Sequence, residues 1–141
     1  MAFLPSLNIS GSGLSAQKLR MDILAQNITN AETTRTENGG PYLKKAVVFT
    51  EQSPSFDAIL RNKQTPGGVT VSDIIQNPDA VKRIYDPDHP DADAEGYVMM
   101  PNISATEEMV DLISASRSYE ANITAFNAVK YMATKALEIG K

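Results

Sequence analysis

The clearest hydrophobic pattern in the chain runs from Ala105 to Ile139, a stretch without Gly or Pro in which apolar residues recur every three or four positions. This spacing predicts one long helix. Ser104 and Glu107 have the spacing of a capping box at its start, and Gly140 follows its end. At 1.5 Å per residue the helix would span about 52 Å, which is long for a single domain of this size.

The apolar positions of this helix form a stripe that needs packing partners along its whole length. An ordinary core helix is the simplest interpretation, but the rest of the chain offers only one other strong helix. The predicted stripe consists of Met109, Leu112, Ser116, Tyr119, Ile123 and Phe126, and it then drifts through Val129, Ala133 and Leu137.

The second predicted helix runs from Ser12 to Ala31, and two helices alone cannot close a core. Amide side chains lie on or near the apolar faces of both helices. A buried amide without a partner is costly, so such residues often fix which partner and which alignment are allowed. A solvated amide on an open face is the alternative. The amides in question are Gln26, Asn27, Asn30, Asn122 and Asn127.

The middle of the chain, residues 32–103, holds most of the Pro and Gly residues, so strands and turns are expected there. Candidate strands are Tyr42–Phe49, Val69–Ile75 and Gly96–Met100, and residues 51–66 are predicted to form a mobile loop. The expected fold is mainly α, with two long terminal helices in an antiparallel, coiled-coil-like pair. Residues 1–31 and 104–141 would form a discontinuous helical core, and residues 32–103 a small β-rich insert.

Composition narrows the possible functions of this 141-residue chain. Aromatic residues make up only 6% and Trp is absent, which argues against a large aromatic-lined pocket. The formal charge of −4 argues against nucleic-acid binding, and the absence of Cys excludes disulfides and thiolate metal sites. Residues 1–10 lack the pattern of a cleaved secretory signal, and no apolar run approaches the ~20 residues of a membrane span.

Two patterns that could indicate a metal site do not meet the requirements of one. The segment from Asp91 to Gly96 begins like a calcium-binding loop, but its twelfth position is Asn102, which cannot chelate as a bidentate carboxylate. His89 is the only histidine and has no second imidazole or thiolate with which to bind a metal. The chain also lacks a nucleophile motif and a phosphate-binding Gly loop. We therefore expect no enzyme, no metal site and no cofactor.

Several motifs resemble a known family in order and over nearly the whole chain. Residues 11–17 and 27–31 resemble the opening of bacterial flagellar axial proteins. The later motifs are similar to those of the proximal rod proteins of the flagellar basal body, whereas residues 51–66 match no motif. These later motifs lie at residues 41–42, 47–49, 67–69, 85–87, 96–98, 101–103, 108–110, 116–122, 130 and 136–140.

This resemblance implies a structural subunit of the hollow rod that crosses the periplasm, exported by the flagellar type III apparatus without a cleaved signal peptide. Its partners would be other rod proteins, basal-body ring and adaptor proteins, and copies of itself. The helices have more apolar surface than they can bury on each other, so neighbouring subunits are expected to complete the packing. The predicted assembly interface comprises Leu14, Met21, Ala25, Asn27, Ile28, Asn30, Met109, Leu112, Tyr119, Asn122, Ile123 and Phe126.

A cytoplasmic coiled-coil adaptor or chaperone-like module is the alternative, and it predicts a compact, fully helical homodimer. The rod interpretation predicts a monomer whose terminal helices become ordered on assembly. Residues 1–31 would be disordered in the free monomer because Pro5, Gly11 and Gly13 weaken the start of the helix.

Overall fold

A computed structural model describes residues 3–37, 39–53, 60, 67–78 and 80–139. Along the chain, one long helix precedes and another follows two small antiparallel β-hairpins. The elements in chain order are α1 (Phe3–Thr29), β1 (Lys45–Glu51), β2 (Val69–Gln76), β3 (Val81–Tyr85), β4 (Tyr97–Pro101) and α3 (Ala105–Ile139).

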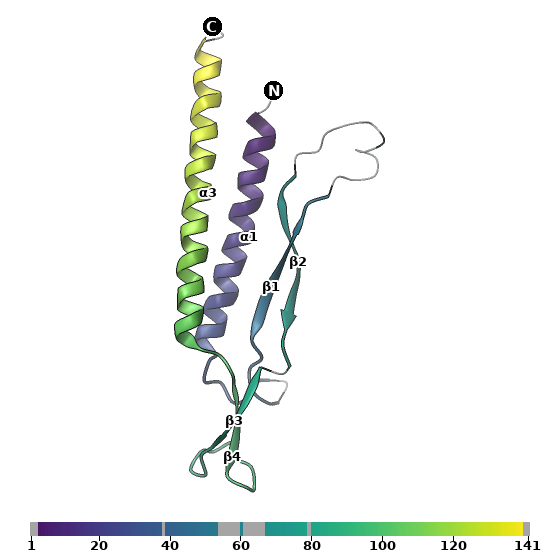
Figure 1. Cartoon of the computed structure of the whole chain (residues 1–141), viewed down its shortest axis with the longest axis vertical. Coiled ribbons are helices and arrows are strands. Elements are labelled where there is room, and N and C mark those ends of the chain that lie inside the picture. The colour runs from purple at the N-terminus through teal and green to yellow at the C-terminus, as the bar shows by residue number, and fades with distance from the viewer. Residues whose placement is uncertain (1–2, 38, 54–59, 61–66, 79, 140–141) are drawn as a thin grey trace.

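The helices lie side by side and antiparallel, as predicted, so the start of α1 and the end of α3 lie at the same end of the molecule (Figure 1). α1 is the middle layer, because it packs against α3 on one side and against the β1–β2 hairpin on the other. The β3–β4 hairpin projects from the opposite end. The predicted mainly α fold with a β-rich segment between terminal helices is confirmed.

α3 has the predicted bounds, and its first turn shows half of the predicted capping box. The backbone N–H of Glu107 donates to the Ser104 hydroxyl at 3.4 Å, and the N–H of Glu108 donates to the Ser104 carbonyl at 3.0 Å. The first contact satisfies a donor that has no acceptor within the helix, and the second is the first hydrogen bond of the helix itself. The predicted end signal, Gly140, lies outside the described residues.

α1 begins at Phe3, well before the predicted start at Ser12, and it ends at Thr29 rather than Ala31. The predicted start was therefore wrong, although Pro5 and Gly11 disfavour helix. Pro5 lies in the first turn, where its missing N–H has no helical acceptor anyway. Gly11 and Gly13 are held within a helix that packs on both sides.

The strand predictions were largely correct, with shifted ends. β1 pairs with β2 from Lys45 opposite Gln76 to Glu51 opposite Val69, with a register shift between Val48 and Phe49. β1 begins after Tyr42, whose backbone N–H instead donates to the Thr33 carbonyl in the preceding loop. β3 was not predicted. Residues 54–59 and 61–66 of the predicted mobile loop at 51–66 lie outside the described residues, and Glu51 belongs to β1.

Only part of the predicted apolar stripe of α3 is buried within the chain. Met109 and Ile123 are exposed, at 51% and 37% of their surface, whereas Glu108 and Ala115 are fully buried. The face of α3 that contacts α1 therefore follows Glu108, Leu112 and Ala115 instead of beginning at Met109. Ala115 is small and allows the backbones of the two helices to approach. Glu108 can be buried there because Asn27 and Lys44 bind its carboxylate.

Candidate assembly surface

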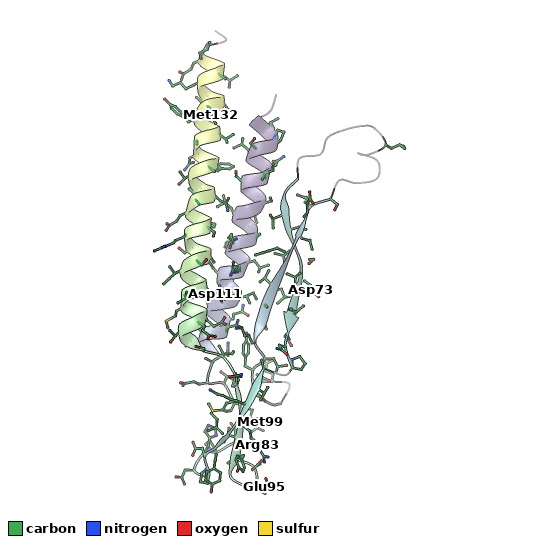
Figure 2. The ribbon with its side chains drawn as sticks, in the orientation of Figure 1. Asp73, Arg83, Glu95, Met99, Asp111 and Met132 are labelled. Carbon is green, nitrogen blue, oxygen red and sulfur yellow. The ribbon has the colours of Figure 1, made fainter. Side chains whose placement is uncertain are left out.

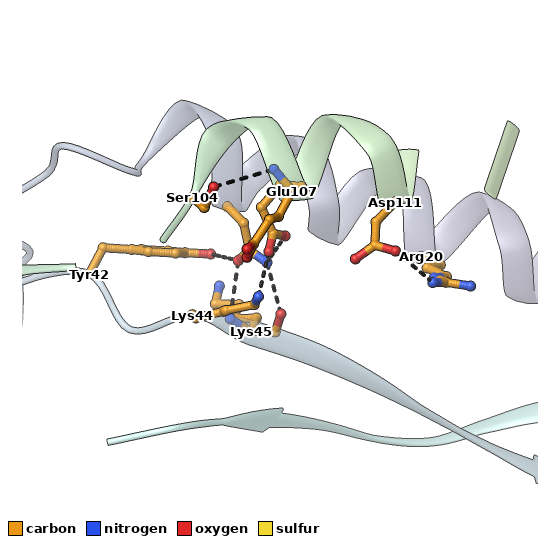
Figure 3. A network of polar contacts seen from close by, with 9 residues as sticks. Arg20, Tyr42, Lys44, Lys45, Ser104, Glu107 and Asp111 are labelled. Carbon is orange, nitrogen blue, oxygen red and sulfur yellow. Dashed lines mark hydrogen bonds and ion pairs between the residues drawn. The ribbon is translucent and has the colours of Figure 1, made fainter. Parts of the chain in front are cut away.

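The end of the helix pair nearest the hairpins is fixed by a buried polar network around Asn27, which has no exposed surface (Figure 3). Its Nδ2 donates to Glu108 Oε2 on α3 and to the Lys45 carbonyl on β1, both at 2.9 Å. Its Oδ1 accepts from the Tyr42 hydroxyl and from the Lys45 N–H, both at 3.1 Å. One amide thus joins α1, α3 and β1 with both donors and its acceptor oxygen satisfied.

Glu108 is the charged member of this network. Its carboxylate pairs with the Lys44 ammonium, which lies just before β1 and is partly exposed. Burial raises the pKa of the Tyr42 hydroxyl, and the nearby Glu108 charge raises it further. Removing one partner from such a buried group leaves an uncompensated charge, so the network strongly favours a single alignment of the helices.

A cleft of about 340 Å³ lies beside this network, between α1, β1 and the first turns of α3. Arg20 on α1 and Asp111 on α3 line it and form an ion pair at 3.6 Å. Lys44 and Glu108 also line the cleft and pair with each other. These four charged groups are therefore engaged in holding α1, α3 and the start of β1 together.

Further along the pair, the helices approach closely at a glycine. A Cβ atom built on Gly13 would lie 3.1 Å from Asn122 Nδ2, closer than an ordinary van der Waals contact. By contrast, a Cβ atom on Gly11 would meet nothing within 4 Å. Gly13 and Asn122 therefore set the separation of the helices, while Asn27 and Glu108 set their alignment.

The structure spreads the predicted interface residues over three environments. Asn27 is fully buried inside the chain, so in this conformation its side chain is not available to a neighbour. The half-buried residues, which lie at the edges of the contacts within the chain, are Leu14, Met21, Ile28, Asn30, Leu112, Tyr119, Asn122 and Phe126. The exposed ones are Ala25, Met109 and Ile123.

Several large apolar side chains of both helices are exposed, and sequence reasoning placed only Met109 and Ile123 of them at the interface. We call the exposed members on both helices the open helix surface. It consists of Leu4, Ile9, Met109, Val110, Ile113, Ile123, Tyr131, Met132, Leu137 and Ile139. Single exposed apolar residues are ordinary, but this number on one helix pair is typical of a surface that another protein covers.

An elongated helix pair with an open apolar surface and internally paired charged groups defines the class of structural subunits that assemble with neighbours. In the described part of the chain, no helix is both long enough and apolar enough to span a membrane.

Comparisons with known proteins identify the family. Residues 7–35 match the family described as flagella basal body rod protein, and residues 94–139 match the C-terminal family of flagellar basal body rod FlgEFG proteins. Flagellar basal-body rod protein FlgC of Bacillus subtilis is 49% identical, with 96% of this chain and 97% of that protein covered. FlgC of Salmonella typhimurium is 42% identical over the whole of both chains.

The chain belongs to the FlgC family of flagellar basal-body rod proteins, and it is a structural rod subunit of the flagellar basal body. FlgC of Borreliella burgdorferi, 41% identical over 99% of this chain and 98% of its own length, extends the similarity to a third organism. The predicted resemblance to the rod proteins is therefore confirmed. The alternative of a cytoplasmic adaptor or chaperone-like module finds no support in these comparisons.

Proposed function

We propose that the chain polymerises through the open helix surface, contacting copies of itself and other rod proteins to build the wall of the hollow axial drive shaft. The supporting observation is the exposure of Met109, Ile113 and Ile123 along α3, whose packing within the chain is against α1. Covering each large aliphatic side chain contributes roughly 1.5–3 kcal/mol before ordering costs are subtracted. Several such contacts per neighbour would support a rod that carries torque.

The same proposal includes how the subunit reaches its place. The flagellar type III apparatus would export it without a cleaved signal peptide, and in the periplasm it would meet other rod proteins and the ring and adaptor proteins of the basal body. Contacts between different faces of successive subunits, which do not close on themselves, generate a helical assembly. Residues on opposite sides of the helix pair would therefore contact different neighbours.

Ile123→Asp tests this interface. Ile123 is 37% exposed on α3, so the new carboxylate remains partly hydrated in the monomer but would be buried between subunits. We expect export to continue, measured as secreted protein, while the number of rods in purified basal bodies and cell motility fall at least about tenfold, equivalent to 1.4 kcal/mol per subunit contact.

Ile75→Asp is the matched control, because Ile75 is 50% exposed on β2 and belongs to neither helix. It introduces the same charge at a similar exposure and should leave rod formation nearly unchanged. Circular dichroism of both purified variants would show whether the monomers keep their helix content. Normal rods built from the Ile123→Asp protein would contradict the proposal.

A further inference from the structure

The β3–β4 hairpin projects away from both helices at the end opposite the start of α1 (Figure 1). It forms a two-stranded sheet of its own, with Val81 opposite Pro101 and Tyr85 opposite Tyr97. A two-stranded hairpin is only marginally stable in water unless other interactions support it. The side chains of this hairpin supply such support on one face.

An arginine and two tyrosines form the centre of that face. The Arg83 guanidinium lies 4.3 Å from the centroid of the Tyr97 ring, and the Tyr85 ring meets Tyr97 edge-on at 5.2 Å. Arg83 Nη2 also donates to Asp93 Oδ2 at 2.9 Å and to Glu95 Oε2 at 3.0 Å. Cation–π, aromatic and charge-assisted contacts thus hold the turn against the strands.

Gly96 fixes the position of the Tyr85 ring from the other side. Its φ of 81° lies in the left-handed region, and a Cβ atom there would lie 3.0 Å from Tyr85 Cε2. Only glycine fits this position without strain or displacement of the ring. The face is therefore ordered before it meets anything, which reduces the entropy that binding would cost.

We call this surface the hairpin face and define it by Arg83, Tyr85, Tyr97 and Met99. The pairing of Arg83 with Met99 and of Tyr85 with Tyr97 places all four on one side of the sheet. Tyr85 is 64% exposed and Met99 is 48% exposed. Figure 2 shows Arg83, Met99 and Glu95 close together on this arm. Tyr, Met and Arg are among the residue types that are enriched at protein–protein interfaces.

The charge around the hairpin face indicates which kind of partner would fit. Residues 81–101 carry five carboxylates and two cationic side chains, a net charge of −3, and Arg35, which pairs with Asp91 at 3.7 Å, brings the charge around this face to −2. The acids lie in the connection between β3 and β4, so they border the aromatic centre on one side. Two such hairpins would repel each other, which disfavours pairing between the hairpins of neighbouring copies.

We propose that the hairpin face docks onto a positively charged, partly apolar surface of a different basal-body subunit. Tyr85 and Met99 would supply the buried centre of the contact, and the acids of the β3–β4 connection, Asp88 among them, would pair with Lys or Arg side chains at the rim. This contact uses a surface separate from the open helix surface. It would fix the β3–β4 end of each rod subunit relative to a second kind of protein.

Photo-crosslinking in assembled basal bodies tests the proposal. The full chain would carry p-benzoylphenylalanine in place of Met99, and mass spectrometry would identify the adducts after irradiation. We expect an adduct to a different basal-body protein, in a segment rich in Lys or Arg. Lys82 is the matched control position, because it lies on β3 one residue from Arg83 and on the other face of the sheet. The same probe there should give several-fold less of that adduct, because successive side chains of a strand point to opposite faces.

A charge reversal separates the contribution of the rim. Asp88→Lys in the probe-bearing chain should lower the yield of the Met99 adduct at least about threefold, because it replaces an attractive rim contact with a repulsive one and leaves the ion pairs of Arg83 with Asp93 and Glu95 intact. An unchanged yield would overturn the role assigned to charge. Adducts only to copies of this chain, or no protein adduct at Met99, would overturn the docking proposal itself. The same probe at Ile123 reports the helix interface independently, so failure of either proposal can be distinguished from failure of the other.

Discussion

Asn27 shows how a residue with weak helix propensity can nevertheless determine the fold. Sequence patterns alone identified it as an amide near an apolar face that could fix alignment. The structure places it at the junction of α1, α3 and β1, with hydrogen bonds to Tyr42, Lys45 and Glu108. The interpretation that a buried amide specifies register is supported, although its partners lie within the chain rather than in a neighbouring subunit.

Asn27→Ala should therefore destabilise the monomer by about 3 kcal/mol, because several buried polar groups would lose a partner at once. Urea denaturation followed by circular dichroism measures this cost. Asn8→Ala is the control, because Asn8 is exposed on the same helix and its replacement should change stability by less than about 0.5 kcal/mol. A cost below about 1 kcal/mol for Asn27→Ala would show that water or rearranged side chains replace its hydrogen bonds.

At the scale of the element, the two glycines of α1 have different roles although they are only two positions apart. Gly11→Ala should stabilise the chain by up to about 1 kcal/mol, because alanine favours helix and its Cβ meets nothing within 4 Å. Gly13→Ala should stabilise the chain less, because its Cβ atom would lie only 3.1 Å from the Asn122 side chain. The comparison requires only the two unfolding curves. Equal stabilisation by both substitutions would mean that the helices can separate at this point without cost.

Residues 1–31 were predicted to be disordered in the free monomer, and the contacts of α1 limit this expectation to a shorter segment. The network around Asn27 anchors the last turns of α1, whereas the first turns contain Pro5, Gly11 and Gly13. Amide exchange of the monomer should be fast over Phe3–Gly13 and slowed near Ile23–Asn27, because local stability follows buried contacts. Assembly should then protect the first turns. Strong protection of Phe3–Gly13 at low concentration would contradict this prediction.

At the scale of the whole molecule, the helix pair could be predicted from sequence because long runs without Gly or Pro leave few alternatives. The packed face of α3 could not, because Glu108 and Ala115 are less apolar than the exposed Met109 and Ile123. Burial of Glu108 depends on Asn27, which lies 81 positions away in the chain. A periodic pattern carries no information about such a partner.

The β3 strand was missed for a related reason. Its sequence, Val81 to Tyr85, contains Lys82 and Arg83, and its strand state depends on pairing with Tyr97–Pro101 across a long connection. Exposed apolar surface on the helices was predicted from the sequence, but most of the residues that form it were not. Excess apolar surface indicated that neighbours complete the packing, but only the structure separates the residues that α1 covers from those that remain exposed.

The common position of the start of α1 and the end of α3 has a practical consequence for imaging this protein in cells (Figure 1). Leu4, Leu137 and Ile139 are exposed at that same end. In the proposed assembly, a fluorescent protein fused to either terminus would therefore sit beside the same part of the open helix surface and compete with the next subunit. Moving the label from one terminus to the other would not remove this competition. A small dye on an exposed side chain outside the open helix surface and the hairpin face is therefore the better choice.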